Sequence, residues 1–494
     1  MDKQMIDYNQ LYQSFVTHEK SKLIAPAGYG KTYAISESLK WTKGHQLILT
    51  HTHAGVASIK EKIKIIKPEC KYTVETISSF AQKYVEAFYC GMLPDQDDAG
   101  FFQFIIKKAA ELFHVETIKT VLKVTYSGLF VDEYQDCSKT HQLLIFAISK
   151  LIPTHVLGDP LQGIFNFNNE PLVDFETDLY SYKNFELHEP WRWKKTNPAL
   201  GEYLKEIRST LLKGKPVDIG LLDGIENCKC LIIKENDIYV NGSDYRKWLN
   251  RIAYNNKSIA DLNDILVLSH ENNIWQRIKL NQKLGNRFHL IEAFDDKDFY
   301  KFSKSFDMLT QSDNLYHDLI TLLKGRIDKR GKKRSKRVGT LLSGLNNYFN
   351  NDFKCPNPKR KELSMIVNKI KLIESNFDFS LLASILISLS KLENVRIVRN
   401  ELFYDLCNSF QKSSIEKISV FESMKEIRNV KRRVGRKING KYIGTTLLTK
   451  GLEAKTVVIL DAHKFTDPKN FYVAMTRASS RLIVFSEENI LNPY

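Results

Sequence analysis

Short apolar runs alternate with longer amphipathic segments along two stretches of the chain. The runs predicted as strands are residues 23–27, 46–50, 128–131, 154–157, 265–268, 457–460 and 482–485. The segments predicted as helices include residues 31–39, 54–66 and 273–284. Apolar runs this short, with no polar alternation, are typical of strands that are covered on both faces of a parallel sheet. The pattern therefore predicts an α/β fold with two parallel sheets.

The pattern also divides the chain into domains. We predict a first domain at residues 1–190 with a small helical insertion at about 81–128, a second domain at residues 191–300 plus 440–494, and a mostly helical insertion at residues 301–440. The longest apolar run without a charge has 12 residues, at 379–390. A helix needs about 20 residues to cross a bilayer. We therefore expect a buried helix there and no contact with a membrane.

The positive charge is concentrated in the predicted insertion. The 494 residues include 73 Lys and Arg against 57 Asp and Glu, a net charge of +16. Residues 301–440 alone hold 29 basic and 14 acidic side chains, with the densest run at 326–337 and a second cluster at 431–437. A charge of this size indicates a polyanionic partner such as single-stranded, duplex or junction DNA. A solvated surface loop is an equally good explanation of such a run.

The cysteines argue against a disulfide scaffold or a zinc site. There are seven, an odd and scattered set in which no two have the C-x-x-C spacing. This usage is typical of a reducing compartment, so we expect a cytoplasmic protein. The first ten residues have no apolar core, and we expect no signal peptide.

Residues 25–32, with the sequence APAGYGKT, follow a predicted strand and open a predicted helix. This is the context of a P-loop, whose backbone N–H groups and helix N-terminus bind phosphate oxygens. Lys31 is expected on the β- and γ-phosphates, and the Thr32 hydroxyl on Mg²⁺. Ala25 stands where the general motif has glycine. The predicted nucleotide contacts of the loop are Ala27, Gly28, Tyr29, Gly30, Lys31 and Thr32.

Two adjacent carboxylates follow the predicted strand at residues 128–131. Asp132 is expected to bind the magnesium ion, and Glu133 to polarise a water molecule for attack on the γ-phosphate. An acidic pair at a strand end is common by itself. Together with a P-loop it predicts an enzyme that hydrolyses ATP with Mg²⁺.

Six segments, in this order along the chain, resemble the motifs of superfamily 1 helicases of the UvrD, Rep and PcrA type. They are APAGYGKT, VDEYQD, LGDPLQGIF, EPWRW, TKGLE and YVAMTRA. The resemblance covers residues 5–300 and 440–487 and does not extend to residues 301–440. It implies two RecA-like domains of the P-loop NTPase class with helical insertions. It also implies that ATP binds between these domains, that single-stranded DNA crosses both, and that the usual direction of movement is 3′ to 5′.

The resemblance assigns roles around the nucleotide. Gln162 matches the γ-phosphate sensor, Arg192 a γ-phosphate arginine, Arg477 the arginine finger and Glu453 the residue that reaches the ribose. Tyr33 and Trp191 match the two faces of the adenine site, where the family usually has Arg at the first position. Gln10 lies near the place of the family's adenine-reading glutamine, although an exposed helix glutamine explains it equally well.

The resemblance also assigns roles on the DNA path. The matched residues are Thr50 and Thr52 in one motif, Thr76 in the next, the aromatics Phe165 and Phe167, and Thr449. Bases would stack on the two phenylalanines, which could instead belong to the core of a strand. Three positions depart from the family: Ile77 replaces a stacking aromatic, Asn168 an arginine and Leu447 a histidine.

Two functions are compatible with these motifs. The first is an ATP-driven helicase or translocase in DNA repair or in defence against phage, because compact helicases of this kind resemble the helicase-like subunit of the Gabija system. The second is a subunit gated by nucleotide and DNA, which signals to a nuclease or another effector protein without robust unwinding. The intact nucleotide motifs favour hydrolysis, and the three replaced positions leave its coupling to DNA movement open.

Overall fold

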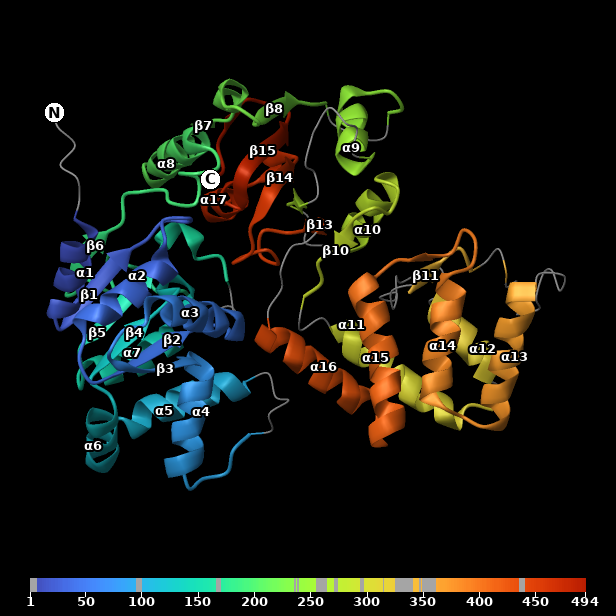
Figure 1. The fold of residues 1–494 in the computed structure, drawn as a ribbon, viewed down its shortest axis with the longest axis horizontal. Helices are drawn as coiled ribbons and strands as arrows, with labels where there is room; N and C mark the ends of the chain where they lie inside the picture. The colour runs from blue at the N-terminus through green and yellow to red at the C-terminus, as the bar shows by residue number, and fades with distance from the viewer. Residues whose placement is uncertain are drawn as a thin grey trace. The chain divides into compact units, whose positions relative to one another are not determined.

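The protein contains two six-stranded sheets flanked by helices (Figure 1). The computed structural model describes residues 7–94, 100–165, 170–234, 237, 240–254, 264–270, 274–293, 297–313, 315–324, 341–345, 348, 361–434 and 440–494. Contacts between residues separate the chain into two compact units. The first holds Met1–His270, Arg433–Gly440 and Thr445–Tyr494, and the second holds Glu271–Arg432 and Lys441–Gly444.

The first sheet is parallel throughout, with the strand order β3-β2-β4-β5-β1-β6. Its strands are β1 (Lys20–Ile24), β2 (His45–Thr50), β3 (Lys71–Thr76), β4 (Gly128–Val131), β5 (Thr154–Gly158) and β6 (Lys183–Glu186). Strands β2, β4 and β5 coincide closely with the apolar runs predicted from the sequence, whereas β1 begins three residues before the predicted run at 23–27 and shares only Leu23 and Ile24 with it. The edge strands β3 and β6 carry more polar residues and were not predicted.

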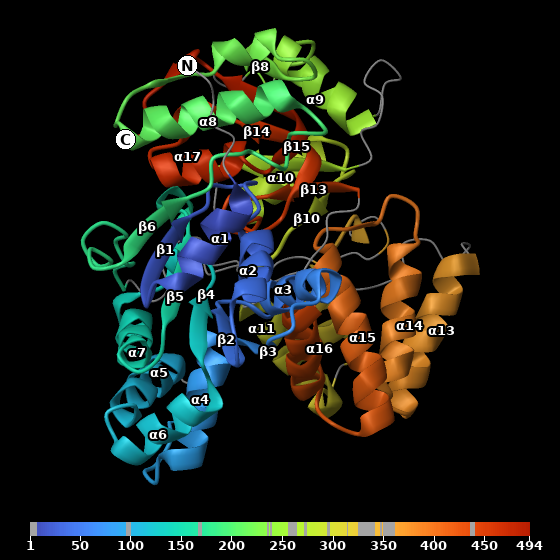
Figure 2. The ribbon, with the colours of Figure 1, turned by 60° about the vertical axis from the view of Figure 1, so that its left-hand side comes forward.

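Helices flank the first sheet in two groups, which Figure 2 shows from another side. Packed side by side are α1 (Tyr8–Thr17), α2 (Lys31–Ser38) and α3 (His53–Ile66). The second group contains α4 (Ile77–Phe88), α5 (Phe101–Leu112), α6 (Glu116–Thr125) and α7 (Lys139–Ser149). Its apolar faces bury an aromatic cluster that includes Phe80, Tyr84 and Phe113.

The second sheet has the order β10-β13-β9-β14-β15-β8, and every neighbouring pair whose register is described is parallel. Its strands are β8 (Lys229–Ile232), β9 (Ile265–Ser269), β10 (His289–Leu290), β13 (Lys441–Gly444), β14 (Ala454–Leu460) and β15 (Ala478–Ser486). Its helices include α8 (Pro198–Leu212), α9 (Asp244–Tyr254), α10 (Ile274–Lys283) and α17 (Pro468–Met475). The prediction of an α/β fold with two RecA-like parallel sheets is confirmed.

The second unit is mainly helical, with its own apolar core. Its helices beyond α10 are α11 (Lys297–Asp307), α12 (Leu315–Lys324), α13 (Lys361–Ser375), α14 (Phe379–Ser390), α15 (Asn400–Glu416) and α16 (Val420–Val434). The apolar run at 379–390 forms α14, whose residues contribute to that core, as predicted. Among the described residues, no helix has the length and apolar character needed to span a membrane.

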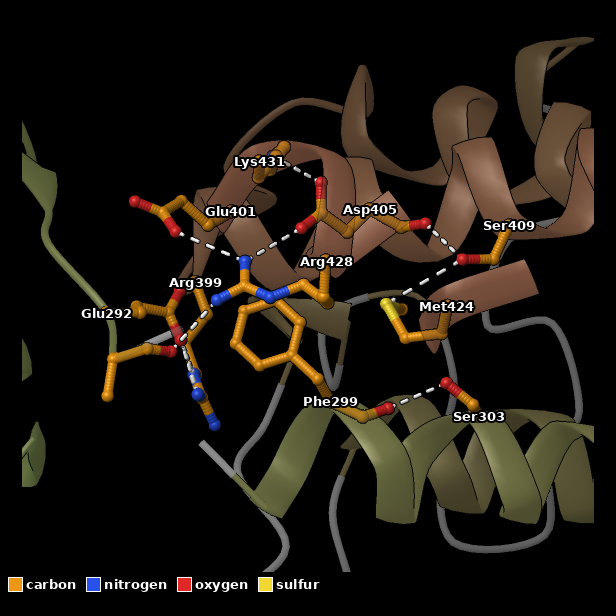
Figure 3. Close-up of polar contacts among 11 residues, drawn as sticks. Glu292, Phe299, Ser303, Arg399, Glu401, Asp405, Ser409, Met424, Arg428 and Lys431 are labelled. Carbon is orange, nitrogen blue, oxygen red and sulfur yellow. Dashed lines mark hydrogen bonds and ion pairs between the residues drawn. The ribbon is translucent and has the colours of Figure 1, made fainter. Parts of the chain in front are cut away.

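Two arginines of the second unit, Arg399 and Arg428, are fully buried (Figure 3). The Arg428 Nη1 atom lies 2.9 Å from Asp405 Oδ2, and its guanidinium lies 3.8 Å from the centre of the Phe299 ring. The Arg399 Nε atom donates to Glu292 Oε2 at 2.6 Å. Further carboxylate partners are Asp298 and Glu401. Because a buried charge without a partner is strongly destabilising, this network holds α11, α15 and α16 together.

The basic clusters of the sequence are only partly described. The run at 326–337 lies outside the described residues, as do residues 435–437 of the second cluster. Within the second cluster, Lys431 forms an ion pair with the buried Asp405. At least this lysine is therefore partly neutralised inside the unit.

His155 gives the first unit a calculable dependence of stability on pH. Its ring is 2% exposed on β5, packs against Phe15 and Phe130, and its Nδ1 lies 2.8 Å from Ser21 Oγ. Burial lowers the pKa of His155 to about 3, with a further contribution from the charge of His18. The unfolded chain binds a proton near pH 6.5, so it holds more protons than the folded chain at lower pH. Stability is therefore lost as the pH falls from about 6.5 towards 3.

We predict that His155→Asn, which keeps a polar atom near Ser21, makes unfolding less dependent on pH. Between pH 6 and 4.5 the wild type should lose about 1.4 kcal/mol per pH unit more than the variant. Thermal or urea unfolding at several pH values measures this difference. Parallel pH profiles for the two proteins would contradict a neutral, buried His155.

Candidate nucleotide site

The P-loop connects β1 to α2 and depends on two glycines. Gly28 and Gly30 have φ angles of 76° and 86°, in the left-handed region that favours glycine. A Cβ atom on Gly28 would lie 2.7 Å from the Trp193 ring, so this position has no room for a side chain. Gly30 precedes the first residue of α2, Lys31. The unpaired backbone N–H groups at the N-terminus of α2 therefore lie at the end of the P-loop, where they could bind phosphate oxygens.

Lys31 lies between the two carboxylates that follow β4. Its Nζ atom is 2.5 Å from Glu133 Oε2 and 3.9 Å from Asp132 Oδ1. Burial alone would lower the pKa of Lys31, but the charges of Glu133 and Asp132 raise it above its ordinary value. Lys31 is therefore a permanent cation. The acidic pair and the P-loop lysine meet, as the sequence analysis expected.

Asp132 and Glu133 differ in environment although they are adjacent. Burial raises the pKa of Asp132, which is 3% exposed. Burial would also raise the pKa of Glu133, but the attraction of Lys31 and Lys450 lowers it. Glu133 has a φ of 53°, a strained backbone conformation for a non-glycine residue. Because of this turn, the two consecutive carboxylates have different surroundings. Glu133 is kept ionised by nearby lysines, whereas the charged form of Asp132 is disfavoured unless a cation binds it.

The residues present fit a magnesium ion. Asp132 Oδ1 is buried, and no described group donates a hydrogen bond to it. A carboxylate oxygen with no donor, beside the hydroxyl-bearing Thr32 at the start of α2, is a suitable ligand pair for Mg²⁺. No group of three acidic, His or Cys side chains suited to a metal occurs in the described part of the chain. The protein would thus supply few ligands, as is usual where phosphates and water complete the shell.

Arg192 connects the P-loop to the part of the chain that forms the second sheet. Its backbone N–H donates to Gly28 O at 2.9 Å, and its Nη1 donates to Thr476 O at 2.5 Å. Its Nε atom lies 2.8 Å from Glu453 Oε2. The predicted γ-phosphate arginine and the predicted ribose carboxylate therefore pair with each other, directly beside the loop.

Arg477 is buried next to Arg192, with only 3% of its surface exposed. Its guanidinium donates to Val473 O at 3.0 Å and to Leu452 O at 3.1 Å. Burial and the charge of Arg192 lower its pKa to about 10, and Glu133 acts in the opposite direction. Arg477 thus remains charged at neutral pH and interacts electrostatically with Glu133, the predicted general base. To reach a γ-phosphate its side chain would exchange these carbonyl contacts for phosphate oxygens.

Two half-exposed aromatic residues, Tyr33 and Trp191, lie close to Gly30. A Cβ atom on Gly30 would be 3.7 Å from Trp191 Cδ1 and 3.9 Å from Tyr33 Cβ. Tyr33 is 49% exposed and Trp191 is 44% exposed, so both rings have faces available for a base. Tyr8 packs edge-on against Trp191 at 5.8 Å between ring centres. The sequence analysis did not identify Tyr8 as part of this site, because only the fold brings α1 to the Trp191 turn.

Gln162, the predicted γ-phosphate sensor, belongs to a buried polar chain. Its Nε2 donates to Asp159 Oδ2 at 2.9 Å. The Gln135 side chain donates to Glu133 and accepts from Asp159 N at 3.1 Å. Lys450, from the TKGLE segment, donates to Asp136 and to Gln162 O. The sensor is therefore connected to the catalytic carboxylate on one side and to the second-sheet segment on the other.

The four threonines predicted to contact DNA differ in exposure and in hydrogen bonding. Thr52 and Thr76 cap helices α3 and α4, accepting from Gly55 N and Ser79 N at 3.0 Å each. Thr50 and Thr449 are buried, at 1% and 0% exposure, and the Thr449 hydroxyl donates to Thr445 O at 2.8 Å. Buried hydroxyls like these present no group to a strand in this arrangement. Thr76 is also buried, at 5% exposure, so only Thr52 of these four has an exposed side chain.

A groove of about 420 Å³ lies beside Thr76, between α3, β3 and α4. Its lining includes His53, Lys60, Tyr72, Thr76, Ser79 and Lys83, together with Glu75, which forms an ion pair with Lys83. The ring of Phe165 is partly buried and lies 4.5 Å from Lys450 Nζ. Phe167 and Asn168 are outside the described residues. Ile77, at the family's stacking position, is 1% exposed, so it offers no surface to a base.

Comparisons with known proteins give one family match, over part of the chain. A family model described as an AAA domain matches residues 9–168. No curated protein matches the chain. Among solved structures, the chain is similar to Pif1 helicase from Bacteroides in complex with ADP-AlF3 and ssDNA, with a TM-score of 0.38 and 10% sequence identity over 100% of this chain and 94% of that chain. It is also similar to Pif1 helicase from Candida albicans, with a TM-score of 0.39 and 13% sequence identity over 97% of this chain and 94% of that chain. Likenesses this distant do not identify an activity, which has to be inferred from the residues of this chain.

We predict that Trp191→Ala raises the KM for ATP by roughly threefold to tenfold, because one face of the adenine loses its stacking partner. Trp191→Phe should restore most of the affinity. DNA binding measured without nucleotide should change little. Trp41 has a similar exposure of 42%, so Trp41→Ala is a matched control for loss of an exposed indole. An unchanged KM in Trp191→Ala would contradict an adenine site at this ring.

Proposed function

We propose that this protein hydrolyses ATP with Mg²⁺ at the junction of its two sheets and uses the reaction to move on single-stranded DNA. One observation carries the proposal. Arg192 donates its backbone N–H to Gly28 O of the P-loop at 2.9 Å, and its side chain bonds Thr476 O at 2.5 Å and Glu453 Oε2 at 2.8 Å, both in the segment that forms the second sheet. A site divided in this way can convert hydrolysis into relative movement of its halves.

The chemistry follows from the charges around the loop. Lys31 and the N-terminus of α2 would bind the β- and γ-phosphates. Glu133, ionised at neutral pH, would accept a proton from the attacking water. Arg192 and Arg477 would stabilise the negative charge on the γ-phosphate oxygens as the bond breaks. When bound by Asp132 and Thr32, Mg²⁺ would supply charge neutralisation between phosphates.

Several features support DNA as the track. Thr52 and Thr76 stand at helix N-termini, where backbone phosphates bind well, and the groove beside Thr76 contains lysines. The Lys450 contacts to Gln162 O and over the Phe165 ring give a route from the phosphate sensor to an aromatic that could stack on a base. By its motifs the protein would be a superfamily 1 helicase of the UvrD type, moving 3′ to 5′. DNA repair or phage defence would be its setting, and the basic 326–337 run would contact duplex or junction DNA.

The buried Ile77 favours a second candidate function. Because it replaces a stacking aromatic and is inaccessible, one grip on the DNA is missing. A protein with weakened grip could use ATP and DNA binding to signal to a nuclease or another effector instead of separating strands. An ATPase assay with and without single-stranded DNA, combined with a strand-displacement assay, distinguishes the two. Stimulated hydrolysis with displacement supports the motor, whereas stimulation without displacement supports the gated subunit.

We predict different defects for Lys31→Ala and Glu133→Gln. Lys31→Ala should weaken ATP binding by about tenfold or more, because a charge-assisted contact to phosphate is lost. Glu133→Gln should bind ATP within about threefold of the wild type and hydrolyse it at least about 100-fold more slowly, because it lacks the general base. Binding of a fluorescent ATP analogue and phosphate release measure the two effects separately. Equal ATP affinity in the two variants would contradict this division of roles.

A further inference from the structure

Asp159 is the central acceptor of the polar chain behind the γ-phosphate sensor. It follows β5 and is 0% exposed. One carboxylate oxygen, Oδ2, accepts from Gln162 Nε2 at 2.9 Å, and the other, Oδ1, accepts from Leu161 N at 3.2 Å. Its own N–H donates at 3.1 Å to Gln135, which in turn donates to Glu133. The position of Asp159 therefore determines how both the sensor and the general base are oriented.

The remaining partner of this carboxylate comes from outside the first sheet. Arg208 lies on α8, which follows the Arg192 turn and flanks the second sheet. Its Nη2 donates to Asp159 Oδ1 at 3.2 Å, and its Nη1 lies 3.7 Å from Glu186 Oε1 at the end of β6. Arg208 is 9% exposed. No motif of the sequence includes it, and no role was predicted for it.

A second contact joins the second-sheet part of the site to the P-loop near Asp159. Tyr472 of α17 is almost completely buried, and the backbone of the P-loop residue Ala27 is close enough to its hydroxyl to lower its pKa against the effect of burial. The Arg208 and Asp159 charges both act on Tyr472 and on the buried P-loop residue Tyr29. The two halves of the site thus share one enclosed polar cluster beneath the phosphate loop. Separation of the halves would expose Asp159 without its cation.

We propose that Arg208 is a positioning residue that makes γ-phosphate sensing depend on closure of the two sheets. With the halves together, Arg208 holds the Asp159 carboxylate, so that Gln162 and Gln135 keep the orientation that hydrolysis requires. With the halves apart, Asp159 loses this contact and both glutamines lose their anchor. The proposal rests on the proposed ATPase function and adds a condition to it: hydrolysis proceeds only in the closed arrangement.

The alternative is that Arg208, like any member of a buried ion pair, only stabilises the fold. The two roles differ in what the variant loses. A structural pair affects the unfolding temperature and every nucleotide state alike. A positioning residue affects kcat and the affinity for a transition-state analogue, while affinity for ADP, which has no γ-phosphate, is kept.

The test uses Arg208→Met, which keeps most of the side-chain volume and removes the charge. We expect kcat to fall about tenfold, the effect of losing one buried charge-assisted hydrogen bond, with the KM for ATP changed by less than about threefold. Affinity for ADP–aluminium fluoride should fall by a similar factor, with ADP affinity within about twofold. Arg208→Lys should recover part of both losses, because it restores the charge without the planar fork.

Lys213→Met is the matched control, since it removes a cation from the exposed end of the same helix. Wild-type kcat and analogue affinity in a folded Arg208→Met would overturn the proposal, as would equal loss of ADP and analogue affinity. If Arg208→Met does not fold, Arg208→Gln, which can still donate to Asp159, is held to the same criteria. A wild type without ATPase activity would defeat the proposed function, and the ratio of analogue to ADP affinity would still decide the role of Arg208.

Discussion

Compensation of buried charge is the constraint on which the candidate site depends. Lys31, Lys450 and Arg208 are withdrawn from bulk water, and each would be costly without an acidic partner. Lys31 is matched by a carboxylate of its own sheet, Glu133. The other two are matched across the junction, Lys450 by Asp136 and Arg208 by Asp159. Charges from the first-sheet part of the site are therefore neutralised by charges from the second-sheet part. A change of charge in one part thus alters the electrostatic energy of the other.

The same constraint explains the two kinds of carboxylate in the site. Glu133 is held ionised by the cations around it, whereas burial leaves Asp132 with a raised pKa and an oxygen to which no described group donates a hydrogen bond. An arriving divalent cation would satisfy Asp132 and reverse that effect. Adjacent residues thus acquire separate tasks from a single left-handed turn at Glu133.

The sequence predicted the centre of the first sheet better than its edges. Strands β2, β4 and β5 are buried and mostly apolar, so the runs are visible in the sequence, whereas β1 contains Lys20, Ser21 and Lys22 and only its last two residues fall in the predicted run. The edge strand β3, Lys71–Thr76, is partly exposed and contains polar residues, and the two-residue strand β10 is too short to give a pattern. Local motifs such as the P-loop were found for a related reason: phosphate chemistry requires those residues to be neighbours in the chain.

Contacts that cross the junction could not be predicted in this way. Arg208 lies 49 positions from Asp159, and Tyr8 is far in sequence from Trp191, so only the fold brings each pair together. The resemblance assigned Thr449 to DNA, but it could not indicate that the hydroxyl is turned inwards to Thr445 O. Burial of a single side chain depends on packing that no local pattern records.

The central claim is that ATP is hydrolysed by groups from both sheets together. The most direct measurement is single-turnover release of γ-phosphate at saturating ATP by Arg477→Ala, alongside ATP binding by the same protein. Arg477 belongs to the second sheet, whereas the P-loop that binds the triphosphate belongs to the first. The account predicts a loss of rate of at least about 100-fold with ATP affinity nearly retained. Hydrolysis at the wild-type rate would show that the first half acts alone, and would contradict a shared site.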